Sequence, residues 1–158
     1  MSDPVAERHM REALRLAAES VAGGGGPFGA VVAQGERVVA RGQNRVTIDM
    51  DPTAHAEVVA IRRACAAVGR FDLRGLTLYS SCEPCPMCLA SIHWARLDRA
   101  YFSATRWDAA AVGFDDEKLY REVSAPLHER EVPTLLLLPE EGRAPFEAWM
   151  AKADRTHY

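Results

Sequence analysis

The sequence predicts an α/β fold, a three-layer α/β/α sandwich in which helices flank a five-stranded mixed sheet. Helical and extended patterns alternate along the chain, and alternation of this kind favours helices packed on a sheet. The 158 residues are 48% hydrophobic and 26% charged, which suits one compact domain that buries most of its apolar surface. We therefore expect a single domain over residues 1–158.

The first element is a helix that begins at Ser2-Asp3-Pro4 and ends at Gly23. Proline suits the first helical turn, and glycine commonly ends a helix. Apolar residues recur between these ends at roughly helical spacing. The glycine run at residues 23–26 is not followed by Gly-Lys-Ser/Thr, so we interpret it as a flexible connection rather than a phosphate-binding loop.

A β-hairpin follows, with strands over residues 28–33 and 37–42 joined by a short turn. A second helix is predicted to begin at Asp51-Pro52-Thr53, because aspartate caps helices and proline suits the first turn. His55 then falls in its first turn. The remaining predicted elements are a strand over 76–80, a helix over 85–95, strands over 100–103 and 134–138, and a terminal helix over 145–153.

Two short segments supply the donors of a predicted zinc site. His-Ala-Glu at residues 55–57 and Pro-Cys-Pro-Met-Cys at residues 84–88 each lie at a predicted helix start. Two thiolates and one imidazole bind Zn²⁺ tetrahedrally and leave the fourth position for water, whereas a structural site normally closes that position with protein. A helix N-terminus also lowers the pKa of a thiol. We therefore assign His55, Cys85 and Cys88 as metal ligands.

Glu57 is the candidate general acid and base. A carboxylate near a zinc site can take a proton from water and return it to a leaving nitrogen. The two-residue spacing from His55 does not place both side chains on one face of a regular helix, so a solvated helix carboxylate is the alternative. His-x-Glu combined with Pro-Cys-x-x-Cys is, however, the signature of zinc deaminases.

The other cysteines and histidines have plainer interpretations. Cys82 extends the run to Cys-x2-Cys-x2-Cys, but an iron–sulfur cluster normally takes four cysteines and no suitable fourth one follows. We interpret Cys82 as a packing residue or one just outside the metal ligands. Crowded cysteines of this kind indicate metal chemistry in a reducing compartment rather than disulfides. Surface or core positions are expected for the remaining histidines: His9, His93, His128 and His157.

The charge and hydropathy of the chain limit the kinds of substrate and partner that it can bind. The formal net charge of -3 and the pI near 6.0 give no broad cationic field, so a small neutral substrate is a better partner than nucleic acid. No signal-like segment opens the chain, and the longest apolar run is the four leucines at 135–138, far too short to cross a membrane. We expect a cytoplasmic protein.

Over nearly its whole length the chain resembles the cytidine-deaminase superfamily of zinc enzymes and, within it, the bacterial guanine deaminases. The overall match includes Pro-Phe-Gly-Ala at 27–30 and Gly-Gln-Asn at 42–44. The finer resemblance depends on Trp94, on Gly-Phe-Asp-Asp at residues 113–116 and on the terminal Tyr158. It implies one Zn²⁺ per subunit and hydrolysis of guanine to xanthine and ammonia, in purine catabolism or salvage. A homodimer with a swapped C-terminal segment is also implied.

The resemblance further implies roles for individual residues. Glu57 and Asp116 would be catalytic. The substrate-binding residues would be Phe28, Asn44, Ala56, Trp94 and Tyr158. Five of these residues have a plainer structural alternative. Asp116 suits a helix cap and Asn44 suits a turn. Phe28 and Trp94 suit a core, and Tyr158 suits a frayed tail.

Two alternatives to guanine deamination stay open. The same zinc chemistry serves other aminated substrates, such as guanosine, ammeline, cytosine or a tRNA adenosine, because pocket shape rather than the metal ligands sets substrate choice. A zinc-stabilised binding module without catalysis is the alternative from a different class. It would require Glu57 to point away from the metal, or protein to fill the fourth position.

Overall fold

The computed structural model describes residues 3–158. These residues divide into two compact units, of which the first ends at Glu117 and the second covers Lys118–Tyr158. All the predicted metal ligands and Glu57 lie in the first unit.

The first unit is built on a four-stranded mixed sheet with the order β2-β1-β3-β4. β1 pairs antiparallel with both β2 and β3, whereas β3 and β4 run parallel. The parallel pair is joined through helix α4, as parallel strands require a crossover connection. The strands are β1 Gly29–Gln34, β2 Arg37–Gln43, β3 Thr77–Cys82 and β4 Arg99–Ala104.

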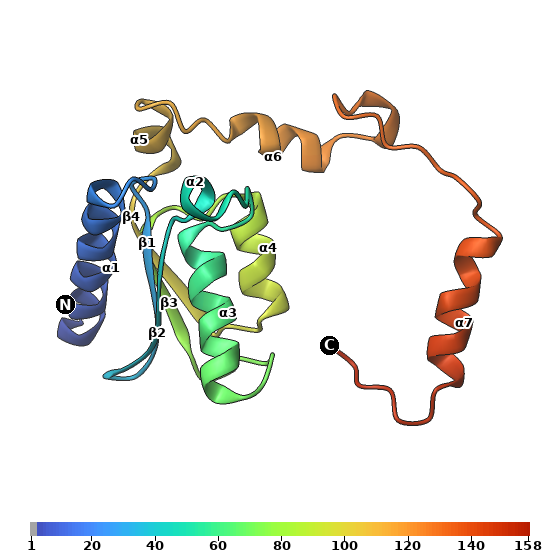
Figure 1. Cartoon of the computed structure of the whole chain (residues 1–158), viewed down its shortest axis with the longest axis horizontal. Helices are drawn as coiled ribbons and strands as arrows, with labels where there is room; N and C mark the ends of the chain where they lie inside the picture. Colours follow the sequence, from blue (N-terminus) through green and yellow to red (C-terminus); the bar gives the residue numbers. More distant parts are fainter. Residues whose placement is uncertain (1–2) are drawn as a thin grey trace. The chain divides into compact units, whose positions relative to one another are not determined.

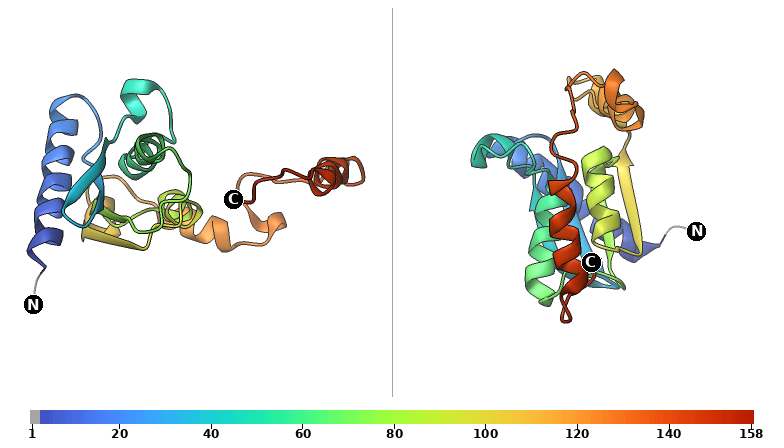
Figure 2. Two further views of the ribbon diagram at one scale, coloured as in Figure 1. Left: turned by 90° about the horizontal axis from the view of Figure 1, so that it is seen from below. Right: turned by 90° about the vertical axis from the view of Figure 1, so that its right-hand side faces the viewer.

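Helices cover both faces of this sheet, as the sequence predicts (Figures 1 and 2). Helix α1 (Pro4–Ala22) packs on one face, and α3 (Ala56–Val68) and α4 (Pro86–Trp94) lie on the other. Each face has its own apolar cluster. The cluster under α1 includes Leu16, Val31 and Tyr79; the cluster under α3 and α4 includes Val32, Ile61, Leu73, Leu78 and Ile92.

Local sequence explains where α1 begins and ends. The Asp3 side chain accepts a hydrogen bond from the Val5 amide, Pro4 is the first helical residue, and Gly23 follows the last one. The predicted bounds are confirmed, with Ser2 outside the described residues. The hairpin is also confirmed, each strand ending one residue later than predicted.

The predicted start of the second helix is wrong by several residues. Asp51 caps a turn instead, since its carboxylate accepts hydrogen bonds from the Thr53 amide and hydroxyl. Helix α3 begins at Ala56, and His55 precedes it as the N-cap residue with extended backbone. His55 is therefore outside the helix rather than in its first turn.

Two glycines allow the helices to approach the sheet closely. A Cβ on Gly42 of β2 would lie 2.1 Å from the Ala56 carbonyl oxygen, and one on Gly29 would lie 2.3 Å from the Ala13 carbonyl oxygen. Such distances are shorter than any real contact, so only glycine fits. Because Ala56 is the first residue of α3, the contact at Gly42 sets the position of the helix start beside His55.

The second unit contains short helices and no strand among its residues. It contains all but the first residue of α6 (Glu117–Ser124) and all of α7 (Ala144–Ala151), with 3₁₀ turns at Leu127–Glu129 and Glu141–Arg143. The fifth strand predicted over residues 134–138 is therefore wrong for the single chain. Its four leucines are between 58% and 86% exposed, and a strand needs a hydrogen-bonding neighbour that the segment does not have here.

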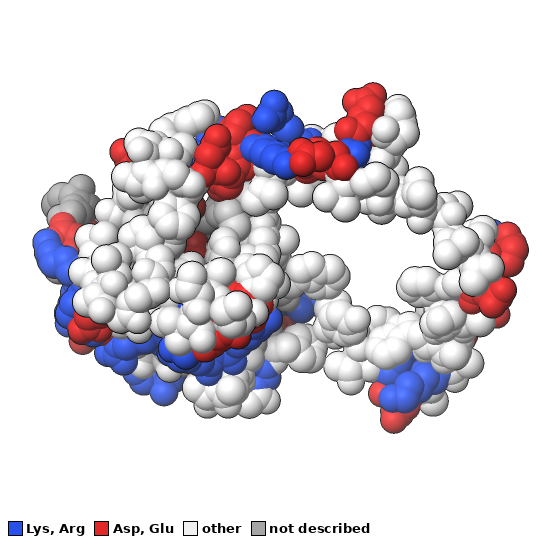
Figure 3. Space-filling view, turned by 45° about the horizontal axis from the view of Figure 1, so that its top comes forward, with Lys and Arg blue, Asp and Glu red and all other residues white. Residues whose placement is uncertain are grey.

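Three further features complete the fold. Two short helices escaped prediction, α2 (Val46–Asp49) and α5 (Arg106–Ala110). Acidic and basic side chains lie next to one another along the left and lower edges of the first unit in Figure 3. Several charged residues of this unit form ion pairs, as Glu12 does with Arg15 and Arg41. Within residues 3–158, no helix combines the length and hydropathy needed to cross a membrane.

Candidate metal centre and active site

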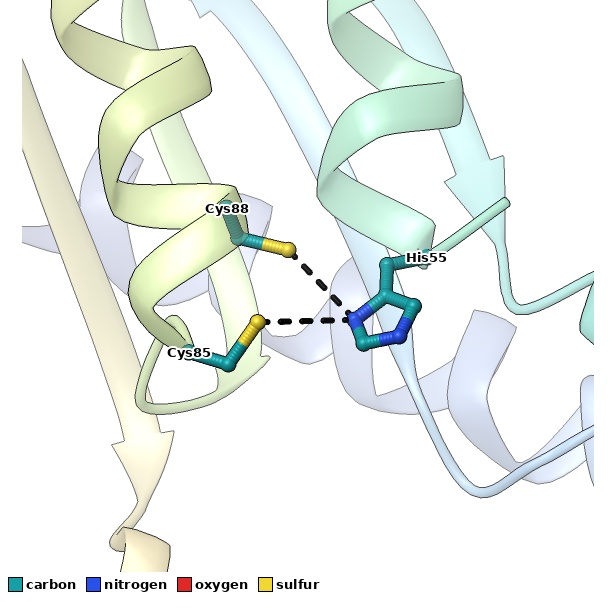
Figure 4. Close-up of side chains that lie close together, drawn as sticks. All are labelled: His55, Cys85 and Cys88. Atoms are coloured by element: carbon teal, nitrogen blue, oxygen red, sulfur yellow. Dashed lines mark hydrogen bonds between the residues drawn. The ribbon is translucent and has the colours of Figure 1, made fainter. Parts of the chain in front are cut away.

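The structure brings the three predicted metal ligands together. His55 lies before α3, whereas Cys85 and Cys88 lie at the start of α4 (Figure 4). The Nδ1 atom of His55 is 3.7 Å from Sγ of Cys85 and 3.5 Å from Sγ of Cys88. All three donor atoms fall within 4.8 Å of one another, which is compact enough for one ion to reach them all.

Helix starts position these ligands. His55 and Cys85 are the N-cap residues of α3 and α4, both with extended backbone, and neither side chain caps its own helix. Pro86 fills the first position of α4, where its missing N–H costs nothing. Cys88 follows one turn later and is fully buried. The backbone thus directs both side chains away from capping and toward each other.

Hydrogen bonds within the group govern its protonation. The Cys88 thiol, and next to it the His55 ring, lower the pKa of Cys85 to about 4 against the opposing effect of burial. The Cys85 thiolate in turn raises the pKa of Cys88, as does burial, and also raises the pKa of His55. The group thus retains protons that a divalent cation would displace on binding.

Glu57 lies beside the ligand group and is itself buried, with 5% of its surface exposed. The Ser80 hydroxyl donates a hydrogen bond of 3.1 Å to its Oε1 atom, and its carboxyl group also interacts with the Cys88 thiol. Burial raises the pKa of Glu57 above its usual range. The alternative of a solvated helix carboxylate is excluded by this burial.

The spacing objection to Glu57 disappears once the helix start is known. Because His55 precedes α3 and Glu57 is its second residue, the two side chains are not constrained by regular helical geometry. The change from extended backbone at His55 to helical backbone in α3 directs the side chains of His55 and Glu57 toward α4.

Cys82 is not part of the ligand group. Its thiol donates a long hydrogen bond of 3.6 Å to the Thr105 carbonyl oxygen, and burial raises its pKa to about 11. A buried, protonated thiol of this kind is a packing residue, in agreement with the interpretation from sequence.

Phe28 and Asn44 lie together at one end of the hairpin. The backbone N–H of Asn44 donates a hydrogen bond of 3.0 Å to the Phe28 carbonyl oxygen. Phe114 packs edge-on against the Phe28 ring, with the ring centroids 5.0 Å apart. The Asn44 side-chain oxygen accepts from the amides of Gly26 and Val46. Asn44 is buried, and its side-chain NH₂ group is the part that suits a ligand.

Asp116 directly precedes α6, and its neighbour Asp115 accepts a hydrogen bond of 3.0 Å from the Glu117 amide. Burial, and next the negative charge of Cys85, raise the pKa of Asp116. The charge of Asp116 is therefore coupled to the metal-ligand group.

Ala56, Trp94 and Tyr158 occupy three different settings. Ala56 is fully buried as the first residue of α3, between His55 and Glu57. Trp94 ends α4, roughly 13 Å from Cys85 at 1.5 Å per helical residue, and is 65% exposed beside a surface hollow of about 430 Å³. Tyr158 belongs to the second unit and is 71% exposed.

Sequence reasoning missed Ser80. The only signal was a serine inside the apolar strand at residues 76–80, where a polar residue on a buried face calls for a partner. That partner, Glu57, lies 23 residues earlier in the chain.

The donor set fits Zn²⁺ by its chemistry. Two sulfur donors and one imidazole nitrogen are the ligands that zinc prefers, and three protein ligands leave one position for water or substrate. Among residues 3–158, no further His, Cys, Asp or Glu joins the group.

Comparisons with known proteins agree with this centre. A guanine deaminase of Bacillus subtilis (strain 168) is 47% identical over 153 residues, which cover 96% of this chain and 98% of that one; its X-ray structure matches with a TM-score of 0.94. The structure of a guanine deaminase from Nitrosomonas europaea matches with 31% identity and a TM-score of 0.68 over 74% of this chain and 67% of that one.

Another relative is named for a nucleic-acid substrate. A tRNA-specific adenosine deaminase of Haemophilus influenzae is 38% identical over 119 residues, or 72% of this chain and 69% of that one. Residues 4–104, which include His55, Cys85, Cys88 and Glu57, match the family described as the cytidine and deoxycytidylate deaminase zinc-binding region. The fold, the donor geometry and these matches together show that the chain belongs to the cytidine and deoxycytidylate deaminase zinc-binding family.

Proposed function

We propose that this chain is a guanine deaminase, which hydrolyses guanine to xanthine and ammonia in purine catabolism or salvage. The observation that carries the proposal is the buried carboxylate of Glu57 beside the His55, Cys85 and Cys88 donors. Full-length similarity to a protein named guanine deaminase supports guanine as the substrate.

Each side chain at the centre has a distinct task. His55, Cys85 and Cys88 hold Zn²⁺, which when bound supplies the Lewis acidity that makes water nucleophilic near neutral pH. Glu57 would take one proton from water as its oxygen adds to C2 of guanine, and pass that proton to a ring nitrogen. It would then take the second proton from the added hydroxyl and pass it to the amino group, which leaves as ammonia. One water enters, and xanthine and ammonia leave.

The environment of Glu57 suits this double task. A carboxyl group transfers protons in both directions best when its pKa lies near the working pH, and burial raises the pKa of Glu57 in that direction. Asp116 is assigned to the guanine edge and to a second proton path. Its partial burial and its coupling to Cys85 support the assignment.

Binding of the base is assigned to residues around the hairpin end and α3. The Asn44 NH₂ group donates to an acceptor on the purine, and Phe28, supported by Phe114, forms a wall. Ala56 contributes at the start of α3. Trp94 also remains a proposed wall of the base, although it lies at the far end of α4 from Cys85.

The C-terminal segment is proposed to cross to a second copy, so that Tyr158 closes the partner's site in a swapped homodimer. Each chain would still be one zinc-deaminase-like domain over residues 1–158. The exposed leucines at 135–138 need an apolar partner. β4 is an edge strand, so residues 134–138 of the partner subunit are suited to pair with it.

A cytoplasmic location is also proposed. None of the four cysteines is in a disulfide. Free thiols of this kind are typical of a reducing environment.

A substrate panel tests the proposed function. Ammonia release is measured with the zinc-loaded protein on guanine, guanosine, ammeline, adenine and cytosine, and on a tRNA anticodon stem-loop. We expect guanine to have the highest kcat/KM. A higher kcat/KM for any other compound would assign the chain to that substrate, and no release from any of them would reject a deaminase.

A further inference from the structure

We propose that Ser80 is a positioning residue that orients the Glu57 carboxylate for proton transfer. The inference rests on the proposed function, because it assigns Glu57 the proton-transfer role. It is carried by one buried hydrogen bond, in which the Ser80 hydroxyl donates to Oε1 of Glu57 at 3.1 Å.

The sheet explains why Ser80 reaches Glu57. Side chains alternate between the two faces of a strand, and along β3 Tyr79 packs in the cluster under α1 whereas Leu78 packs in the cluster under α3 and α4. Ser80 shares the face of Leu78 and therefore points toward α3. Its neighbour in β1 is Ala30, whose small side chain leaves room for the carboxylate.

A serine at this position is unusual for a core. Ser80 is 1% exposed and occupies the middle of a strand whose neighbours are buried, where an aliphatic residue would pack better. A buried hydroxyl without a partner is destabilising. Glu57 is the partner, and both groups are removed from water.

The hydrogen bond leaves Glu57 with one defined geometry. A glutamate carboxylate rotates broadly about its last torsion, but the bond at Oε1 fixes its plane. The carboxyl group is then held at Oε1 by Ser80. Oε2 is the oxygen we assign to proton transfer.

The Ser80 hydroxyl is closed off from solvent, with 1% of the residue exposed, so it acts on the Glu57 carboxylate and not directly on a bound base. Ser80 itself exchanges no proton and touches no substrate.

The first test is the kinetics of Ser80→Ala in the zinc-loaded protein. A hydrogen bond to a charged group is worth enough that its loss lowers kcat by about tenfold to a hundredfold. KM for guanine should change by less than about threefold, because Ser80 acts through Glu57 rather than on the substrate. Zinc content should stay at one per chain.

A matched pair separates the hydroxyl from its shape. Ser80→Thr keeps the hydroxyl and Ser80→Val has the same branched shape without it. We expect the threonine variant to retain most of the wild-type kcat and the valine variant to fall with Ser80→Ala. Equal kcat values for the pair, or a wild-type kcat in Ser80→Ala, would overturn the proposal, as would loss of zinc with loss of kcat.

Ser81 supplies the control. It is also buried, but it lies on the opposite face of β3, where its hydroxyl accepts from the Gly29 amide at 3.0 Å. Ser81→Ala removes a hydroxyl of the same kind and should leave kcat within about threefold of wild type. A fall as large as that of Ser80→Ala would make the effect one of strand packing.

Crystal structures of zinc-loaded wild type, Ser80→Ala and Ser80→Thr test the positioning without turnover. The Glu57 carboxylate should have one orientation in wild type and Ser80→Thr, and more than one in Ser80→Ala. An unchanged single orientation in Ser80→Ala would overturn the inference. Absence of guanine turnover in wild type would reject the proposed function, while this structural comparison would still decide on Ser80.

Discussion

Sγ of Cys88 lies 3.5 Å from Nδ1 of His55, although 33 residues separate them along the chain. Two helix starts, one before α3 and one before α4, meet at this point. The geometry of the metal centre therefore depends on how α3 and α4 pack on the sheet. A substitution that shifts either helix should change the zinc affinity.

The effect of a cysteine substitution on zinc content should depend on its position. Cys88→Ala removes a donor from the group, so zinc per chain, measured by inductively coupled plasma mass spectrometry, should fall well below one. Cys82→Ala removes only a packing thiol bonded to Thr105 and should keep full zinc. Equal zinc content in the two variants would contradict the assignment of ligands.

Gly42→Ala should disturb the centre from outside it. The new Cβ would lie 2.1 Å from the Ala56 carbonyl oxygen, so α3 must shift, at a cost of about 1–3 kcal/mol in the free energy of unfolding. Zinc affinity should fall with it. Gly142→Ala is the control, because nothing lies within 4 Å of its Cβ. Denaturant unfolding and zinc titration check both effects; a Gly42→Ala protein as stable as wild type would refute the close packing.

Glu12 should make stability depend on pH in acid. Hydrogen bonds from Arg15 and then Arg41 lower its pKa to about 2. A folded-state pKa below the unfolded value of about 4.3 stabilises the fold above that value. The contribution is lost as pH falls from about 4 to about 2.

Glu12→Gln should therefore cost at most about 1 kcal/mol at neutral pH, since the pairs are partly exposed. Its Tm should lie below that of wild type at pH 7, and the gap should close as the pH falls toward 2. Glu36→Gln, which removes an exposed carboxylate from the hairpin turn, is the control. A Tm gap that is constant over this range would mean that the carboxylate charge contributes nothing.

The C-terminal segment should matter for turnover and not for zinc. Deleting residues 155–158 should sharply reduce kcat/KM for guanine, while zinc stays at one per chain and the mass in solution equals that of two shortened chains, as the proposed homodimer requires. Tyr158→Ala should reproduce much of the loss, and Tyr158→Phe should retain more activity because it keeps the ring. Unchanged kcat/KM after the deletion would count against a closing role for the segment.

Much of the fold was predictable because local signals agree with tertiary structure. Pro4 and Gly23 delimit α1, and the turn residues delimit the hairpin. The grouping of His55, Cys85 and Cys88 was predictable because these donor types and this spacing are typical of metal sites. Asp51 misled the prediction of α3, since its side chain bonds Thr53 within a turn, and a capping residue and a turn residue look the same in sequence.

The remaining features depend on contacts that no local pattern contains. The partnership of Ser80 with Glu57 requires the face of β3 and the start of α3 to be known together. The leucines at 135–138 have the composition of a strand, yet a strand forms only where another strand offers its edge. The sequence of such a segment indicates that it tends to form a strand, but it does not show which strand it pairs with.

Turnover of guanine by zinc-loaded wild type and Glu57→Gln tests the central claim most directly. Wild type should form xanthine and ammonia in equal amounts. Glu57→Gln keeps the size of the side chain and should keep one zinc per chain, but kcat should fall by about 10²- to 10⁴-fold because the proton acceptor is gone. A zinc-loaded Glu57→Gln protein with the wild-type kcat would contradict the account.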